Sequence, residues 1–541
     1  MAYKKESKEK LAESGKYFGY RSSEDNVNKF EYVDDWGEKY VGLVSLSLNV
    51  LNTVTGEIST VGGIDDTMWT VGQPVFLPHV KGGTGTGMAT DIPSYRLAYT
   101  AWKNGPKKLG MIYCYQRESS IFVVDLSNLL NPEKQASAES TSELQSTPKD
   151  LTGTETHVLV TSGIKLARSA RVSADGMRMI FLGSKRGFST HNGCSELMSV
   201  QVPDIIRSLA EVTAREEERK DDSTGDEKKD DRLSHEIQIN TIVPSISCPG
   251  TTETSSVFGT FPGIYADQLP RNCFLNDDCV VMSTPWGSVE TIIAIHLSSG
   301  KIEKIDIPLE NVSVENMSKI SSNILDIQKV EQKNINISQN EILVTISTPS
   351  SSQTVALLNV LMDEDCNGVK SSIAIKLITP PSDYIPNQKP ITRLKPSKKV
   401  SPDDPKADLK KNDTVKLYRK IDIQQKLNGD KNFNKLLDWK TTRYYDANGI
   451  PFESILITPK MTEKGVYGFE DFGVSRKCPL IVVPHGGPHS CMTTTYVASY
   501  AFLALYLGAA VLHVNFRGST GFGQQSIDTL LGTIQHSSVL L

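Results

Sequence analysis

The chain has 541 residues, too many for one compact core, so its length predicts two or three domains. Hydrophobic residues make up 38% and charged residues 22% of the sequence, as in ordinary globular proteins. The net charge of −5 gives no electrostatic reason to expect nucleic acid or an anionic membrane as a partner.

The start of the chain and its cysteines indicate a compartment. The first twenty residues contain several lysines but no apolar run, so we expect no secretory signal. The eight cysteines are scattered and form no CxxC pair. In a long chain without an export signal, this pattern favours free thiols in a reducing cytoplasm.

From residue 30 to about 375, short apolar or alternating runs separated by turn residues predict β-strands. An apolar strand closed by a polar turn recurs at 45–59, 119–128, 195–204, 290–305 and 353–361. A turn followed by a strand precedes several of these units, as at 171–184 and 274–288. A β-sandwich would give similar strands, but five occurrences of the same strand-and-turn unit favour the radial repetition of a β-propeller.

Three polar segments interrupt this pattern, at 131–153, 215–232 and 380–413. The second has fifteen charged residues among eighteen, and the third is rich in proline and lysine. None contains enough apolar surface to offset the conformational entropy of ordering the chain. We therefore expect three disordered or solvated insertions within a propeller region that covers residues 1–430.

After residue 430 the pattern becomes that of an α/β domain, assigned to 431–541. Residues 443–460 predict a hairpin with a tight turn at Asn448-Gly449. A fully buried strand at 478–484, a helix from Thr494 to Leu507 and a strand at 509–516 then predict a parallel sheet. The apolar run between this helix and strand is long enough for a membrane span, but Gly508 predicts a helix C-cap inside it, so we expect no span.

His485, Gly486, Gly487 and Pro488 lie where the first of these strands ends. Hydrolysis of an ester or a peptide needs hydrogen-bond donors directed at a developing oxyanion, and glycines allow backbone N–H groups to approach it. An ordinary glycine turn would explain these four residues equally well. The second glycine-rich segment, "NFRGSTGFG" at 515–523, follows the next predicted strand and favours the functional interpretation.

Together, "PHGGPHS" at 484–490 and "VNFRGSTGFGQQSI" at 514–527 resemble the acylaminoacyl-peptidases of the prolyl oligopeptidase family of serine peptidases. Residues 30–59, 119–126 and 261–281 resemble the propeller of that family more loosely. The resemblance implies a seven-bladed propeller followed by an α/β-hydrolase domain. It also implies release of an N-acylated amino acid from a short acylated peptide, no cofactor, and a homo-oligomer.

The resemblance also assigns roles to residues of the two motifs. It makes the N–H groups of Gly486 and Gly487 oxyanion donors, with His485, Pro488 and Arg517 supporting the site wall. No Gly-x-Ser-x-Gly segment occurs in the 541 residues, and Ser519 lies outside such a motif. We therefore expect the serine, aspartate and histidine of the reaction beyond Leu541, in a chain that is shortened at both ends.

The remaining alternatives concern metal binding and function. His485 and His489 are four residues apart, but the glycines and the proline between them exclude a helix and no third ligand is evident, so we predict no metal site. A non-catalytic propeller with a binding or regulatory role is the main alternative to a peptidase that is inactive as written. Another peptidase of the same family, such as a dipeptidyl peptidase, is the third.

Overall fold

The structure is a computed structural model. It describes residues 2–3, 46–78, 95–104, 116–127, 129, 155–221, 237–250, 260–305, 307, 321–330, 339–361, 374–377, 436–462, 465–466 and 478–532. The predicted insertions at 131–153 and 380–413 lie outside the described residues, and so does the part of the second insertion from 222 to 232.

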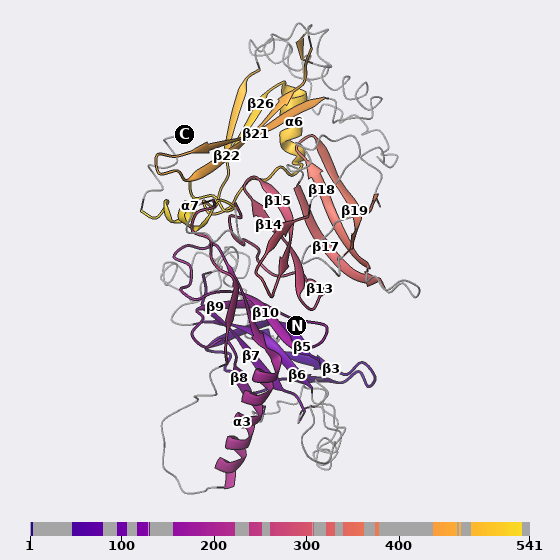
Figure 1. Cartoon of the computed structure of the whole chain (residues 1–541), viewed down its shortest axis with the longest axis vertical. Helices are drawn as coiled ribbons and strands as arrows, with labels where there is room; N and C mark the ends of the chain where they lie inside the picture. Colours follow the sequence, from indigo (N-terminus) through magenta and orange to yellow (C-terminus); the bar gives the residue numbers. More distant parts are fainter. Residues whose placement is uncertain are drawn as a thin grey trace, which may run out of the picture.

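The first part of the chain consists of β-strands that pair antiparallel with their sequence neighbours (Figure 1). Two short pairs come first: β1 (Ala2–Tyr3) with β2 (Leu46–Ser47), and β3 (Asn49–Leu51) with β4 (Ile58–Thr60). Four-stranded units follow. The first contains β5 (Trp69–Leu77), β6 (Arg96–Lys103), β7 (Ser119–Asp125) and β8 (His157–Leu159). The second contains β9 (Leu166–Val172), β10 (Arg178–Ser184), β11 (Glu196–Gln201) and β12 (Asn240–Val243). A parallel pairing of Ser119 with Leu166 connects β7 to β9, so these two units form one eight-stranded sheet.

Two further units have the same pairing. The third contains β13 (Phe274–Asn276), β14 (Cys279–Trp286), β15 (Val289–His296) and β16 (Ile302–Lys304). The fourth contains β17 (Ser321–Val330), β18 (Gln339–Thr348), β19 (Ser351–Leu361) and β20 (Ala374–Leu377). The strands predicted at 119–128, 171–184, 195–204, 274–288, 290–305 and 353–361 are confirmed.

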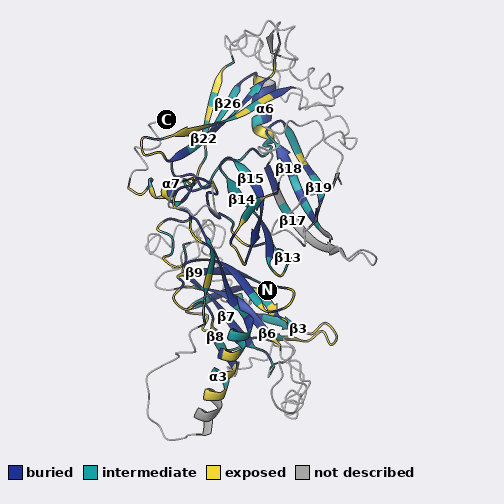
Figure 2. Ribbon diagram, viewed as in Figure 1, coloured by how far each residue is buried: buried dark blue, intermediate teal, exposed yellow. Residues whose placement is uncertain are grey.

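Consecutive units pack face to face, and alternate residues of one strand enter two different cores (Figure 2). In β10, Met179 and Phe181 lie in the core shared with the first unit, whereas Ile180 and Leu182 lie in the core shared with the third. Strand β14 divides its side chains between its two neighbours in the same way. Each inner sheet is therefore buried on both faces, as in stacked blades. Within the described residues the sheets do not close into a ring.

Helix α3 (Val202–Asp221) follows β11 and corrects one prediction. Its first turns bury Val202, Ile205 and Leu209 in the core of the first two units. The helix continues into the charged run, so residues 215–221 are helical and not part of a loop. This happens because a helix anchored by its amphipathic first turns can extend through glutamate, arginine and lysine, which are good helix formers.

The last part of the chain forms a four-stranded mixed sheet in the order β21-β22-β26-β25. Its elements are β21 (Leu437–Tyr445), β22 (Pro451–Pro459), β25 (Leu480–Pro484), α6 (Ala498–Leu507) and β26 (Ala510–Asn515). A separate small pair joins β23 (Met461–Thr462) to β24 (Gly465–Val466), and the short helix α7 (Gln524–Asp528) follows the sheet. The parallel pairing of β25 with β26 through α6 confirms the predicted strand–helix–strand unit.

Local details of this part differ from prediction. The hairpin is confirmed, but Asp446 accepts hydrogen bonds from the amides of Asn448 and Ile450, so the connection is a five-residue loop and not a two-residue turn. Helix α6 begins at Ala498 and not at Thr494, because the amide of Thr494 donates to Ser288 O, 2.8 Å away, in the third unit. The predicted αL C-cap at Gly508 is confirmed.

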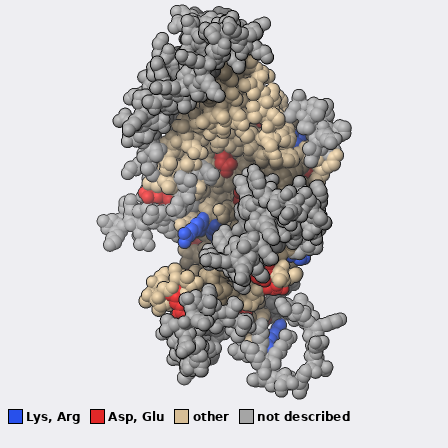
Figure 3. Space-filling model, turned by 180° about the vertical axis from the view of Figure 1, so that it is seen from behind, with Lys and Arg blue, Asp and Glu red and all other residues tan. Residues whose placement is uncertain are grey.

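The prediction of a fully buried β25 is wrong. Leu480 is 58% exposed and Val482 is 54% exposed, and both lie on the same face of this edge strand. Only the opposite face, which includes Val483, packs towards α6. In the described part of the chain, no helix is both long and apolar enough to cross a membrane. The face shown in Figure 3 carries scattered charged side chains of both signs.

Candidate active site

The glycine loop, residues 485–490, leaves the carboxyl end of β25 and presents two backbone amides. Gly487 has φ +59°, a left-handed conformation that favours glycine. A β-carbon at Gly486 or Gly487 would meet nothing within 4 Å, so open space adjoins both residues. Neither amide donates to another described residue. The loop thus offers two adjacent donors to an acceptor group that enters this space.

His485 fixes the base of this loop. Its ring stacks on Phe516 with centroids 4.4 Å apart. Its Nε2 lies 2.7 Å from Ser519 Oγ, and because that hydroxyl donates to Phe516 O, the imidazole is the donor. Its Nδ1 lies 3.1 Å from Ser490 Oγ at the other end of the loop. Burial lowers the pKa of His485.

The other predicted support residues lie around the same loop. Pro488 is partly buried within it. Arg517 Nη1 pairs with Asp446 Oδ2 at 3.3 Å, so this arginine holds the β21–β22 loop and does not point to the glycine amides. His489 is buried, and its Nδ1 lies 3.0 Å from Gly518 O, which ties the two glycine-rich segments together.

A loop of the β-rich part also contacts the glycine loop, and sequence reasoning missed it. The loop between β10 and β11 places His191 Nε2 3.3 Å from Gly487 O. It also places the His191 ring 5.1 Å from the His489 ring and Asn192 Nδ2 3.5 Å from His489 O. Nearly 300 residues separate these partners in the sequence, so no local pattern could have indicated the contact.

The second glycine-rich segment is part of the interface with the β-rich units. The amide of Gly523 donates to the hydroxyl of Tyr265 at 2.9 Å, and Gln524 Oε1 accepts from the amide of Cys194 at 2.8 Å. Gly523 has φ +93°, and a β-carbon there would collide with Ser247 O. Only glycine fits this approach, which explains the glycine that ends the motif.

The serines near the glycine loop are engaged or inaccessible. Ser519 and Ser526 have no exposed surface, and the Ser526 hydroxyl accepts a hydrogen bond from the Gly518 amide. Ser490 Oγ donates to Gly486 O at 2.8 Å. None of the three is positioned as a free nucleophile. Among the described residues, no group of three histidine, cysteine, aspartate or glutamate side chains could hold a metal ion.

Comparison with known proteins agrees with the two motifs. A family model for the N-terminal domain of acylamino-acid-releasing enzyme matches residues 5–208 and 226–362. Acylamino-acid-releasing enzyme 2 of Oryza sativa subsp. japonica is 26% identical over 533 residues, which cover 96% of this chain and 54% of the relative. The acylamino-acid-releasing enzyme of Mus musculus is 23% identical over 513 residues, which cover 95% of this chain and 49% of the relative. The chain therefore spans about half the length of these curated relatives.

Two further similarities concern a shorter segment of the chain and solved structures. The acylamino-acid-releasing enzyme of Homo sapiens is 42% identical over 91 residues, which cover 17% of this chain and 11% of the relative. Among solved structures, the acylaminoacyl peptidase of Pyrococcus horikoshii aligns with 91% of this chain and 60% of its own at 9% identity. The TM-score of this superposition is 0.33. A puromycin hydrolase superimposes with a TM-score of 0.36 at 10% identity, and the alignment covers 92% of this chain and 61% of the hydrolase chain. These superpositions are too loose to support an argument about the site.

Proposed function

The chain belongs to the acylamino-acid-releasing enzyme family, and from this membership we propose that it supplies the oxyanion-binding part of a serine acylaminoacyl-peptidase. The proposed reaction releases an N-acylated amino acid from the N-terminus of an acylated peptide. The observation that carries the proposal is the pair of amides at Gly486 and Gly487, which adjoin open space and have no acceptor among the described residues.

The chemistry follows from the charge that develops during acyl transfer. Attack on a carbonyl carbon puts negative charge on its oxygen, and fixed N–H donors stabilise that charge without reorganising during the reaction. The hydrogen bonds of His485 to Ser519 and Ser490 hold the loop in one conformation. In this proposal His485 is therefore a positioning residue and not the catalytic base.

We also propose that the nucleophile, the acid and the base are not among these 541 residues, and that the chain alone does not hydrolyse acylated peptides. The absence of Gly-x-Ser-x-Gly from the sequence supports this. So does the structure around Ser490, Ser519 and Ser526, whose hydroxyls are engaged or buried. The proposal differs from a purely binding or regulatory role in that the glycine loop becomes functional once a nucleophile faces it.

Three further features are part of the proposal. A closed seven-bladed propeller is supported by the stacking of consecutive four-stranded units on both faces. A cytoplasmic location is supported by six described cysteines that are all free thiols. The substrate is an N-acylated peptide, and the assembly is a homo-oligomer.

Two measurements test the function. The 541-residue chain is expected to show no labelling by a fluorophosphonate probe and no release of acetyl-alanine from an acetylated peptide. Joined to the remaining half of the rice relative, it is expected to gain both. In the joined protein, Gly487→Val should lower the rate by about 10²–10³-fold, because valine keeps the backbone N–H but does not tolerate φ +59°, so the donor turns away from the oxyanion.

A matched variant controls for the substitution itself. Gly56→Val also replaces a left-handed glycine with open space around it, but in the β3–β4 turn, and should leave the rate unchanged. Specific labelling of the 541-residue chain at any of its serines would contradict the proposal. An unchanged rate in Gly487→Val would contradict the role of the glycine loop.

A further inference from the structure

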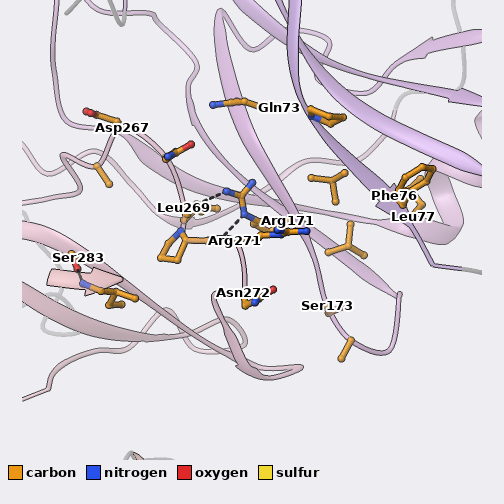
Figure 4. A pocket seen from close by; sticks show the side chains of 18 of the residues that line it. Gln73, Phe76, Leu77, Arg171, Ser173, Asp267, Leu269, Arg271, Asn272 and Ser283 are labelled. Carbon is orange, nitrogen blue, oxygen red and sulfur yellow. Dashed lines mark hydrogen bonds between the residues drawn. The ribbon is translucent and has the colours of Figure 1, made fainter. Parts of the chain in front are cut away.

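A cavity of about 1270 Å³ lies where the four β-units meet (Figure 4). Strands β5, β9, β14, β15 and, through Ile324, β17 contribute to its wall, together with the segment 265–272 that precedes β13. Pockets for small ligands usually measure about 300–1,000 Å³. This cavity is therefore large enough for a peptide of several residues.

Two arginines lie side by side in the cavity (Figure 4). The guanidinium of Arg171 is already engaged, because it donates to the carbonyl oxygens of Ala170, Leu269 and Pro270. Arg271 is exposed, lines the same cavity, and has no hydrogen-bond or ion-pair partner among the described residues. Burial lowers the pKa of Arg171, and the adjacent Arg271 charge lowers it further. A bound anion would relieve this repulsion.

The other charges of the cavity restrict which anion fits. Asp267 and Glu290 also line it, and the pKa of Glu290 is raised to about 7 by burial and then by the charge of Asp267. These carboxylates disfavour a multiply charged anion such as phosphate. A single carboxylate at the end of an uncharged peptide meets less of that repulsion than a multiply charged anion does, and the exposed Gln268 offers an amide to the peptide backbone.

One side of the cavity borders the candidate active site. Tyr265 lines the cavity, and its hydroxyl accepts the hydrogen bond from Gly523. The pKa of Cys491, the residue after the glycine loop, is raised to about 12 by burial and next by the charge of Glu290. A peptide in the cavity therefore lies next to the elements that carry the glycine loop.

The wall of the cavity also contains a strained residue. Gln73, in a bulge of β5, has φ +50°, and its side chain accepts hydrogen bonds from Thr100 Oγ1 at 3.0 Å and from the amide of Ser169 at 2.8 Å. Ser169 has φ +61°. Such conformations persist only where the surroundings enforce them, and they are concentrated at binding sites.

We propose that this cavity binds the free carboxylate end of a short peptide and that Arg271 receives the carboxylate. The inference rests on the proposed function, because an acylated peptide has a blocked amino end and leaves its carboxylate as the terminal charge. Arg271 would then determine specificity by favouring peptides short enough to bring their carboxylate into the cavity. It takes no part in bond breaking.

The test measures binding by the 541-residue chain and needs no turnover. Isothermal titration calorimetry compares acetyl-trialanine carrying a free carboxylate with the same peptide as its C-terminal amide, at low salt. The free acid is expected to bind about fivefold more tightly, the upper range for an exposed ion pair. Arg271→Gln should abolish this preference. Arg207→Gln, at an exposed arginine of α3 that pairs with Asp204, should retain it.

The inference would be overturned by equal affinity for acid and amide, by a preference that persists in Arg271→Gln, or by no binding of either peptide. Competition by inorganic phosphate as strong as that by the peptide acid would indicate a general anion site and would also overturn it. A failure of this inference can be distinguished from a failure of the proposed function. If the joined protein hydrolyses acetylated peptides but its Arg271→Gln variant keeps the acid preference, only the present inference is wrong.

Discussion

Replacing His485 with alanine should loosen the glycine loop by a measurable amount. The substitution removes the stacking of the ring on Phe516 and the hydrogen bonds to Ser519 and Ser490. A stacked ring pair contributes about 1 kcal/mol and each hydrogen bond about 1 kcal/mol net. We therefore expect His485→Ala to lower the free energy of opening in this region by about 3 kcal/mol.

A second variant separates the two contributions. His485→Phe keeps a ring against Phe516 but can make neither hydrogen bond, so we expect a loss of about 2 kcal/mol. Native-state hydrogen exchange of the amides in β25 and β26 measures the opening free energy where the loop is attached. A loss below about 0.5 kcal/mol for His485→Ala, or equal losses for the two variants, would refute the assignment of His485 as the anchor.

Three further predictions concern this part of the chain. Burial lowers the pKa of His513 to about 4, so as the pH falls below 6.5 the unfolded state binds a proton before the folded state does, and stability is lost down to about pH 4. In His513→Phe the free energy of unfolding should therefore depend less steeply on pH in this range, by up to about 1.4 kcal/mol per pH unit. An unchanged slope would contradict this. The exposed face of β25 should promote self-association, so Leu480→Lys combined with Val482→Lys should lower the mass measured by light scattering, and an unchanged mass would show that this face does not mediate it. His191→Ala should speed hydrogen exchange at Thr520, whose amide donates to Ser490 O at the end of the glycine loop, while changing global stability by less than about 0.5 kcal/mol. Unaltered exchange at Thr520 would contradict a role of the β10–β11 loop in holding the glycine loop.

Much of the fold could be predicted from the sequence, because strands and turns leave local signals. The alternation in β10 and β14 and the apolar runs of β25 and β26 gave strand positions that the structure confirms. The C-cap at Gly508 followed from the conformational freedom of glycine. The glycine loop at Gly486 and Gly487 was located correctly at the end of its strand for the same reason. Its role as an oxyanion site is still a proposal.

Other features depended on contacts between residues that are distant in the sequence. The start of α6 was set by the bond of Thr494 to Ser288, and the exposed face of β25 by its position at the edge of the sheet. The approach of His191 to Gly487 and the pairing of Arg171 with Arg271 in one cavity could not be predicted either. Local sequence determines backbone conformation over a few residues, whereas burial and the pairing of charges depend on which sheets pack together.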